Sequence, residues 1–155
     1  MQHEFIISGD HFQIYVEDEN SNADTSEIWN NQTSNDMLAV ASGLIAVGTI
    51  RYGGDVALTV EVLDRRPTDP LEHCDQVAEC SINISSGRIV ISSPEGELSK
   101  APRITVPPGT YRALVCYSNL DSVIDENNPK GEDLYRIILW PDSSIEPVIL
   151  KRRQS

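Results

Sequence analysis

The clearest pattern along the chain is an alternation of apolar and polar residues with a period of two. In residues 55–63 the branched apolar residues occupy every second position, namely Val56, Leu58, Val60 and Val62. Successive side chains of a strand point to opposite faces of a sheet, so this period predicts a β-strand with one buried face. Residues 110–117 repeat the pattern and predict a second strand, whose alternate positions are Tyr111, Ala113, Val115 and Tyr117.

Seven further segments are short, rich in apolar, β-branched or aromatic residues, and bounded by residues that favour turns. They are residues 11–17, 44–50, 77–84, 88–92, 103–106, 134–140 and 147–150. Ser85, Ser86 and Gly87 separate two of these segments, and this short Gly-containing connection predicts a hairpin between 77–84 and 88–92.

Residues 33–42 are ambiguous. Ser34 or Asn35 is a suitable N-cap and Gly43 a suitable stop, which together predict a short helix. The alternative is a bulged segment at the edge of a sheet. We favour one or two helical turns.

About nine strands separated by turns, without the alternation of strands and helices that marks βαβ units, indicate an all-β fold. We predict a two-sheet antiparallel β-sandwich with at most one short helix. Its 155 residues (1–155) suit a single domain with a sizeable core. A closed barrel remains the alternative, because the pattern of strands does not reveal closure.

Charge narrows the class of partner. The chain carries 24 acidic and 12 basic residues, a formal net charge of -12 at pH 7. This balance argues against binding to nucleic acid and to anionic membranes, both of which need a basic surface. It favours a basic protein partner, although acidity that serves only solubility explains the charge equally well.

Location is predicted from what the sequence lacks. Residues 1–12 have neither the basic start nor the apolar run of a signal peptide. No apolar stretch approaches the roughly 20 residues of a membrane-spanning helix. We therefore expect a cytoplasmic protein with its three cysteines, Cys74, Cys80 and Cys116, reduced.

Motifs for catalysis are missing from the sequence. Gly53 and Gly54 are not followed by the lysine of a phosphate-binding loop, and there is no Gly-x-Ser-x-Gly elbow. The three histidines are scattered along the chain. We expect a protein that is not an enzyme and that binds no cofactor.

Two groups of residues were considered as metal ligands. His73, Cys74 and Cys80 offer three zinc ligands, but their spacing fits no common site and a fourth ligand is missing. Asp125 and Asn127 resemble part of a calcium loop, but Gly131 is in the wrong register and no closing glutamate follows. We expect no metal, and we interpret the acidic loop 119–133 as a solvated loop or a protein-contact surface.

Several segments together resemble the competence protein J family. They are residues 11–16 (His-Phe-Gln-Ile-Tyr-Val) with the acidic loop and Trp29 that follow, the apolar and glycine-containing residues 40–49, the Pro-Gly-Thr-Tyr turn 108–111, and residues 134–140. That family comprises small β-sandwich inhibitors of a bacterial DNA-entry nuclease, and similar folds serve as bacterial immunity proteins. The resemblance implies an intracellular inhibitor that covers its partner. The longer acidic loop and the basic tail 151–153 depart from the family pattern.

The hypothesis for the binding surface follows from charge and from this resemblance. An acidic loop can occupy the basic cleft of a nuclease as a phosphate mimic, with fast and salt-sensitive association. We expect the electrostatic contacts to be Asp121, Asp125, Glu126, Glu132 and Asp133. A second patch is expected at Asp18, Glu19 and Trp29. The alternative is a structural or accessory sandwich that forms a homodimer, with residues 147–150 as the first edge to consider.

Overall fold

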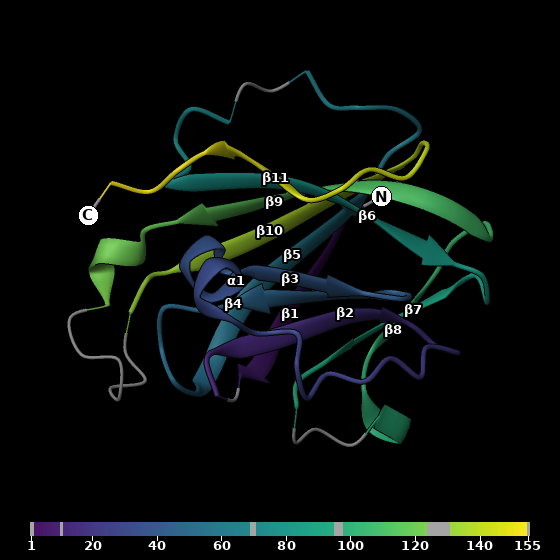
Figure 1. Ribbon diagram of the computed structural model, residues 1–155, viewed down its shortest axis with the longest axis horizontal. Coiled ribbons are helices and arrows are strands. Elements are labelled where there is room, and N and C mark those ends of the chain that lie inside the picture. Colours follow the sequence, from purple (N-terminus) through teal and green to yellow (C-terminus); the bar gives the residue numbers. More distant parts are fainter. Residues whose placement is uncertain (1, 10, 69–70, 95–97, 124–130, 155) are drawn as a thin grey trace.

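Two stacked β-sheets make up the computed structural model, which describes residues 2–9, 11–68, 71–94, 98–123 and 131–154 (Figure 1). The first sheet has the order β1 (Gln2–Gly9), β5 (Gly54–Val62), β10 (Leu134–Pro141), β9 (Gly109–Ser118), β6 (Gln76–Ile84) and β11 (Val148–Lys151). The second has the order β3 (Leu38–Ala41), β4 (Leu44–Gly48), β2 (Gln13–Asp18), β7 (Arg88–Ser92) and β8 (Arg103–Thr105). The predicted all-β sandwich is confirmed.

Each of the nine predicted strands overlaps an observed strand, and β1 and β3 are additional. Neighbouring strands pair in antiparallel fashion with one exception among the described pairs, since β5 and β10 run parallel. The ambiguous segment contains both of its alternatives. A helix α1 (Asn31–Asp36) is followed at once by the edge strand β3.

The ends of α1 differ from the predicted ones. Its N-cap is Asn30, whose side chain accepts from the Thr33 backbone while the Thr33 hydroxyl accepts from the Asn30 backbone. This reciprocal capping arrangement satisfies donors that the first helical turn leaves unpaired. The helix ends at Met37, in the left-handed conformation with φ of 57°, and not at Gly43. Two 3₁₀ turns, η1 (Leu98–Lys100) and η2 (Leu120–Ser122), complete the helical elements of the described residues.

The predicted hairpin between β6 and β7 is wrong. β6 pairs with β9 and β11 in one sheet, whereas β7 pairs with β2 and β8 in the other. The short turn between them is therefore a corner that carries the chain from one sheet to the other. Asp18 of β2 fixes this corner, because its carboxylate accepts from the backbone and hydroxyl of Ser86 and from the hydroxyl of Ser85.

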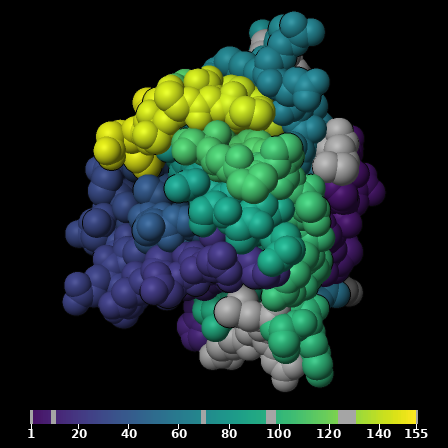
Figure 2. Space-filling model, turned by 90° about the vertical axis from the view of Figure 1, so that its right-hand side faces the viewer, coloured from purple at the N-terminus to yellow at the C-terminus, as the bar shows by residue number. Residues whose placement is uncertain are grey.

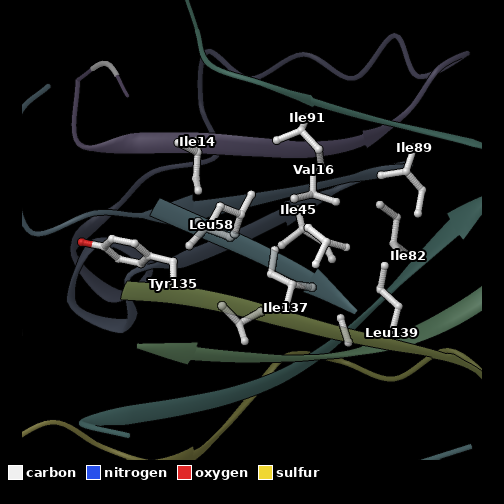
Figure 3. Close-up of a cluster of buried hydrophobic side chains, with 14 of the residues drawn as sticks. Ile14, Val16, Ile45, Leu58, Ile82, Ile89, Ile91, Tyr135, Ile137 and Leu139 are labelled. Carbon is white, nitrogen blue, oxygen red and sulfur yellow. The ribbon is translucent and has the colours of Figure 1, made fainter. Parts of the chain in front are cut away.

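The main core lies between the two sheets (Figure 3). Ile14, Val16, Ile45, Ile89 and Ile91 enter it from the five-stranded sheet, and Leu58, Ile82, Tyr135, Ile137 and Leu139 from the six-stranded sheet. Of the four residues predicted to share the buried face of β5, Val56, Leu58 and Val60 are buried there, and Val62 is partly buried against the same core. Alternate residues of β9 are buried there as well.

A second cluster covers part of the outer face of the six-stranded sheet. It consists of Leu71, Cys74, Val77, Leu114, Cys116, Ile138 and Trp140. Leu63, Leu71 and Cys74 pack on this face, and Arg66 lies 5.3 Å from the centre of the Trp140 ring. β10 is thus buried on both faces along most of its length, which explains why residues 134–140 are almost continuously apolar. Among the described helices, none is long and apolar enough to cross a membrane.

Two substitutions in β10 separate buried from exposed positions of one strand. Ile137→Ala is expected to lower the free energy of unfolding by about 2–5 kcal/mol, because it leaves a cavity in the main core. Leu134→Ala, at a position that is 48% exposed, is expected to change it by less than about 0.5 kcal/mol. Urea unfolding followed by circular dichroism measures both. Equal losses would contradict the assignment of the two faces.

Candidate functional site

A cavity of about 910 Å³ opens at the end of the sandwich where β2 begins and β4 ends. Its wall combines apolar, amide and basic side chains. The described lining residues are His11, Phe12, Gln13, Trp29, Ser34, Asn35, Met37, Gly48, Thr49, Ile50, Gln76, Arg152 and Arg153. This volume is at the upper end of the range, roughly 300–1,000 Å³, that is typical of ligand-binding pockets.

One wall of the cavity is built by two turns that are bonded to each other. The Phe12 amide donates to the carbonyl of Tyr52 (3.0 Å), and the Thr49 amide donates to the carbonyl of Phe12 (2.7 Å). The rings of Phe12 and Tyr52 meet edge to face, with centroids 5.4 Å apart. The backbones of His11 and Phe12 both have positive φ, of 51° and 63°. Residues other than glycine adopt this conformation only when the surrounding structure enforces it.

Trp29 stands beside this wall, immediately before the cap of α1. Its indole N–H donates to Oε1 of Gln13 at 2.8 Å, which fixes the ring relative to β2. The side chain is partly buried against the small cluster formed by Tyr15, Ala39, Leu44 and Ala46. The indole ring of Trp29 is therefore fixed in position where it lines the cavity.

The basic tail forms another part of the wall. Arg152 pairs with Asp36 of α1 (2.8 Å), and Arg153 pairs with Asp121 of the acidic loop (2.9 Å). The Gln76 side chain connects the end of α1 to the tail, because its amide donates to the carbonyl of Asp36 (2.6 Å) and its oxygen accepts from the backbone of Arg153 (3.2 Å). The tail thus lies against the cavity and brings the acidic loop next to it.

A buried ion pair joins the acidic loop to the turn after β4. Arg51 donates through two nitrogens to the two carboxylate oxygens of Asp133, and both side chains are almost completely buried. The hydroxyl of Tyr135 donates to Asp133 (2.8 Å) and accepts from the amide of Ile50 (2.9 Å). The bond to Asp133 raises the pKa of Arg51, and burial raises the pKa of Tyr135. Asp133 is predicted as an electrostatic contact with a partner, but in this structure its side chain is buried and paired with Arg51.

The remaining residues of the predicted acidic loop divide into two groups. Asp121, with a side chain 90% exposed, and Glu132, also exposed, lie at the same end of the sandwich as the cavity. The two sides of the loop are bonded at its base, where Ser122 Oγ accepts from the Glu132 amide (2.7 Å). Asp125 and Glu126, like the calcium candidate Asn127, lie outside the described residues.

The second predicted patch is not one surface. Asp18 and Glu19 lie at the far end of β2, whereas Trp29 is bonded to Gln13 at its start. Asp18 is buried, contrary to expectation, and although burial opposes its ionisation, the bonds from Ser86 and Ser85 hold its pKa below the ordinary value. Glu19 is occupied by Arg88 and Arg103, at 2.8 and 2.7 Å.

The described residues offer little for catalysis or metal binding. No three histidine, cysteine, aspartate or glutamate side chains among them come close enough to hold a metal ion. Cys80 lies in the main core and Cys74 in the outer cluster, on opposite faces of one sheet, so the zinc candidates do not converge. Hydrogen bonds with Cys116 and Ser118, together with the charge of nearby His73, outweigh the effect of burial and lower the pKa of the Cys74 thiol to about 6. This side chain is nevertheless buried and does not line the cavity.

Several lining residues could not have been identified from the sequence. Phe12, Thr49, Gln76 and Arg152 come together from segments that are distant along the chain. The pairing of Arg51 with Asp133 joins residues 82 positions apart, and no local pattern marks either of them as a partner. Trp29, which is predicted as a partly exposed aromatic in an irregular segment, lines the cavity, and its part in binding stays a prediction.

Comparison with solved structures shows that other proteins have this fold. ComJ from Bacillus subtilis, an inhibitor of the DNA degrading activity of NucA, is similar over 92% of this chain and 96% of its own, with a TM-score of 0.65 and 14% sequence identity. A protein described as crocagin biosynthetic gene J is similar over 92% of this chain and 98% of its own, with a TM-score of 0.61 and 19% identity. No family model matches the chain, and no curated protein does. The resemblance to competence protein J is therefore confirmed as a likeness of fold.

Replacing each of two aspartates of the loop distinguishes a structural charge from a surface charge. Asp133→Asn leaves Arg51 buried without its counter-ion and is expected to lower the free energy of unfolding by about 3–5 kcal/mol. Asp121→Asn removes an exposed ion pair and is expected to lower it by less than about 1 kcal/mol. Chemical denaturation of both variants gives these values. Similar losses would mean that the Arg51 pair does not anchor the loop.

Proposed function

We propose that this chain is a non-enzymatic, cytoplasmic protein-binding domain, an inhibitor or immunity-type protein that covers a basic partner such as a nuclease or toxin. The observation that carries the proposal is the meeting of an aromatic cavity with exposed acidic side chains at one end of the sandwich. The fold likeness to a nuclease inhibitor over most of both chains supports the same class of function.

Trp29 supplies the apolar part of the contact. Held aromatic side chains at the centre of an interface contribute much of its binding energy, because they bury large areas and lose little conformational freedom. The indole is fixed by Gln13 before any partner arrives, and the adjacent cavity has room for a side chain of the partner.

Asp121 and Glu132 supply the electrostatic part. In this structure Asp121 pairs with a surface arginine, Arg153. Exposed ion pairs of this kind are worth about 0–1 kcal/mol, so a lysine or arginine of the partner can replace Arg153 at little cost. The net charge of -12 adds long-range attraction for a basic protein, which accelerates association at low salt.

The proposal predicts that two variants change different rate constants, one for association and the other for dissociation. Asp121→Ser combined with Glu132→Ser is expected to slow association about tenfold at low salt and to flatten its salt dependence. Trp29→Ala is expected to act on dissociation and to weaken binding by about 2 kcal/mol or more, roughly thirtyfold. The chain is first used to capture its partner from native lysate at low and high salt, and rates are then measured by surface plasmon resonance with the purified partner.

A matched control removes the same charge elsewhere. Asp64→Ser combined with Glu146→Ser replaces two exposed carboxylates; Asp64 follows the end of β5 that lies opposite the acidic loop. This control should leave the association rate within about twofold of the original, since it changes net charge but not the proposed contact. Loss of the partner's activity when the chain is added tests inhibition. Unchanged rates in both site variants, or a captured partner whose activity is unaffected, would overturn the proposal.

A further inference from the structure

The two sheets have four edge strands, β1, β11, β3 and β8. Edge strands expose backbone N–H and C=O groups that can pair with another chain, and monomeric proteins protect them by short length, prolines, bulges, lysines or a covering element. The four edges of this protein differ clearly in such protection.

Three of the edges are protected. β8 has three residues and lies between Pro102 and Pro107. β3 has four residues and follows directly on α1, which packs against it. β11 has four residues, a register shift between Ile149 and Lys151, and the charge of Lys151 itself.

β1 has none of these features. All eight of its residues pair with β5 in unbroken antiparallel register, and they include no proline, lysine or arginine. In Figure 2 the start of the chain, in purple, runs along the right-hand margin of the molecule. Ile6 is 68% exposed on the outer face of this strand, the most exposed of the large apolar residues described. Ile6 and Leu134 both lie opposite Ala57, so an exposed apolar row crosses β1, β5 and β10.

We propose that β1 is a self-association edge, at which two copies of the chain pair β1 with β1 in antiparallel fashion and join their six-stranded sheets. The two-fold axis passes beside Ile6. In this register Ile6 lies opposite Ile6 of the partner subunit, and Phe5 lies opposite Ile7 of the partner subunit. The proposal concerns an interface separate from the cavity and does not rest on the proposed function.

Self-complementarity favours a second copy over a different protein. Antiparallel pairing about Ile6 places apolar side chains against apolar ones on both faces, and it places Glu4 opposite Ser8 of the partner subunit. Apolar side chains that face each other across two antiparallel strands stabilise the pairing, whereas two like charges in such positions destabilise it. A register centred on Glu4 would place the two Glu4 carboxylates together and is therefore disfavoured.

A buried polar atom on the same strand also supports pairing at this edge. Within the described part of the chain, the Nε2 of His3 is the one buried side-chain nitrogen or oxygen without a hydrogen-bond partner. Such atoms are rare in complete structures, because leaving one unsatisfied is unfavourable. His3 lies in the edge strand that the proposed partner would cover, where backbone groups of a second copy become available.

Salt separates this association from partner binding. Two copies that each carry -12 repel one another, and added salt screens that repulsion, so self-association should strengthen as salt is raised. Attraction between the acidic end and a basic partner should weaken under the same change. β1 and β11 are opposite edges of one sheet. None of the described β1 residues lines the cavity, although residues 11–13, which follow β1, do, so pairing through β1 itself uses no lining residue.

Sedimentation analysis of the full chain over a range of concentrations, at low and high salt, tests the association. Ile6→Lys is expected to raise the dissociation constant of the dimer at least about tenfold. The matched control is Val148→Lys on the opposite edge, a position that is 46% exposed, and it should leave the constant within about twofold. A wild-type chain that stays monomeric throughout, or an Ile6→Lys variant that dimerises like the wild type, would overturn the proposal.

Cysteine cross-linking tests the register independently. Ile6→Cys should form a disulfide-linked dimer on mild oxidation, since opposed residues of antiparallel strands have Cβ atoms about 4.5–5.5 Å apart. Glu4→Cys should not, because the two Glu4 positions would be about 13 Å apart along the strands. The native cysteines are all buried, so they contribute little background. Cross-linking by Glu4→Cys alone, or by neither variant, would show that the chains do not pair about Ile6.

Discussion

Strands β9 and β10 lie side by side in the middle of the six-stranded sheet, and their burial on both faces supports the rest of the structure. Their inward side chains meet the five-stranded sheet, and their outward ones pack against Leu63, Leu71 and Cys74. This double burial holds the two sheets, the outer cluster and the start of the acidic loop to one rigid centre. Burial of apolar surface stabilises the folded state by roughly 25 cal/mol per Å². The buried area of these two strands therefore contributes more to the free energy of folding than the weak ion pairs on the surface at the ends of the sandwich.

The ends of the sandwich are organised by polar contacts that the core alone does not dictate. At one end Asp18 binds the corner between the sheets, and at the other Asp133 binds Arg51 and Tyr135. A buried charge is tolerated only when paired and hydrogen-bonded, so each of these carboxylates fixes the position of the segments that supply its donors. The exposed acids around the cavity are thereby carried on a defined base, which is what a surface for recognition requires.

Strand positions could be predicted because the period of two is a local property, clearest in residues 55–63. The grouping of strands into sheets could not. Ser85, Ser86 and Gly87 have the composition of a hairpin turn, and nothing nearby in sequence indicates that Asp18 redirects them into a corner. The acidic residues were misjudged for the same reason, since the sequence gives the charge of Asp133 but not the arginine that buries it. Trp29 was expected beside Asp18 because the two are close in the chain, whereas β2 separates them in space.

The parallel pairing of β5 with β10 also bears on how the chain folds. It joins residues separated by about half of the chain, such as Val60 and Ile137, and β1 depends on β5 for all of its pairing. Closing loops of this length before their contacts form is entropically unfavourable, so folds dominated by distant pairings fold slowly. During synthesis the six-stranded sheet can therefore not be completed before β10 has been made. β1 and β5 emerge from the ribosome long before the strand that will bury them.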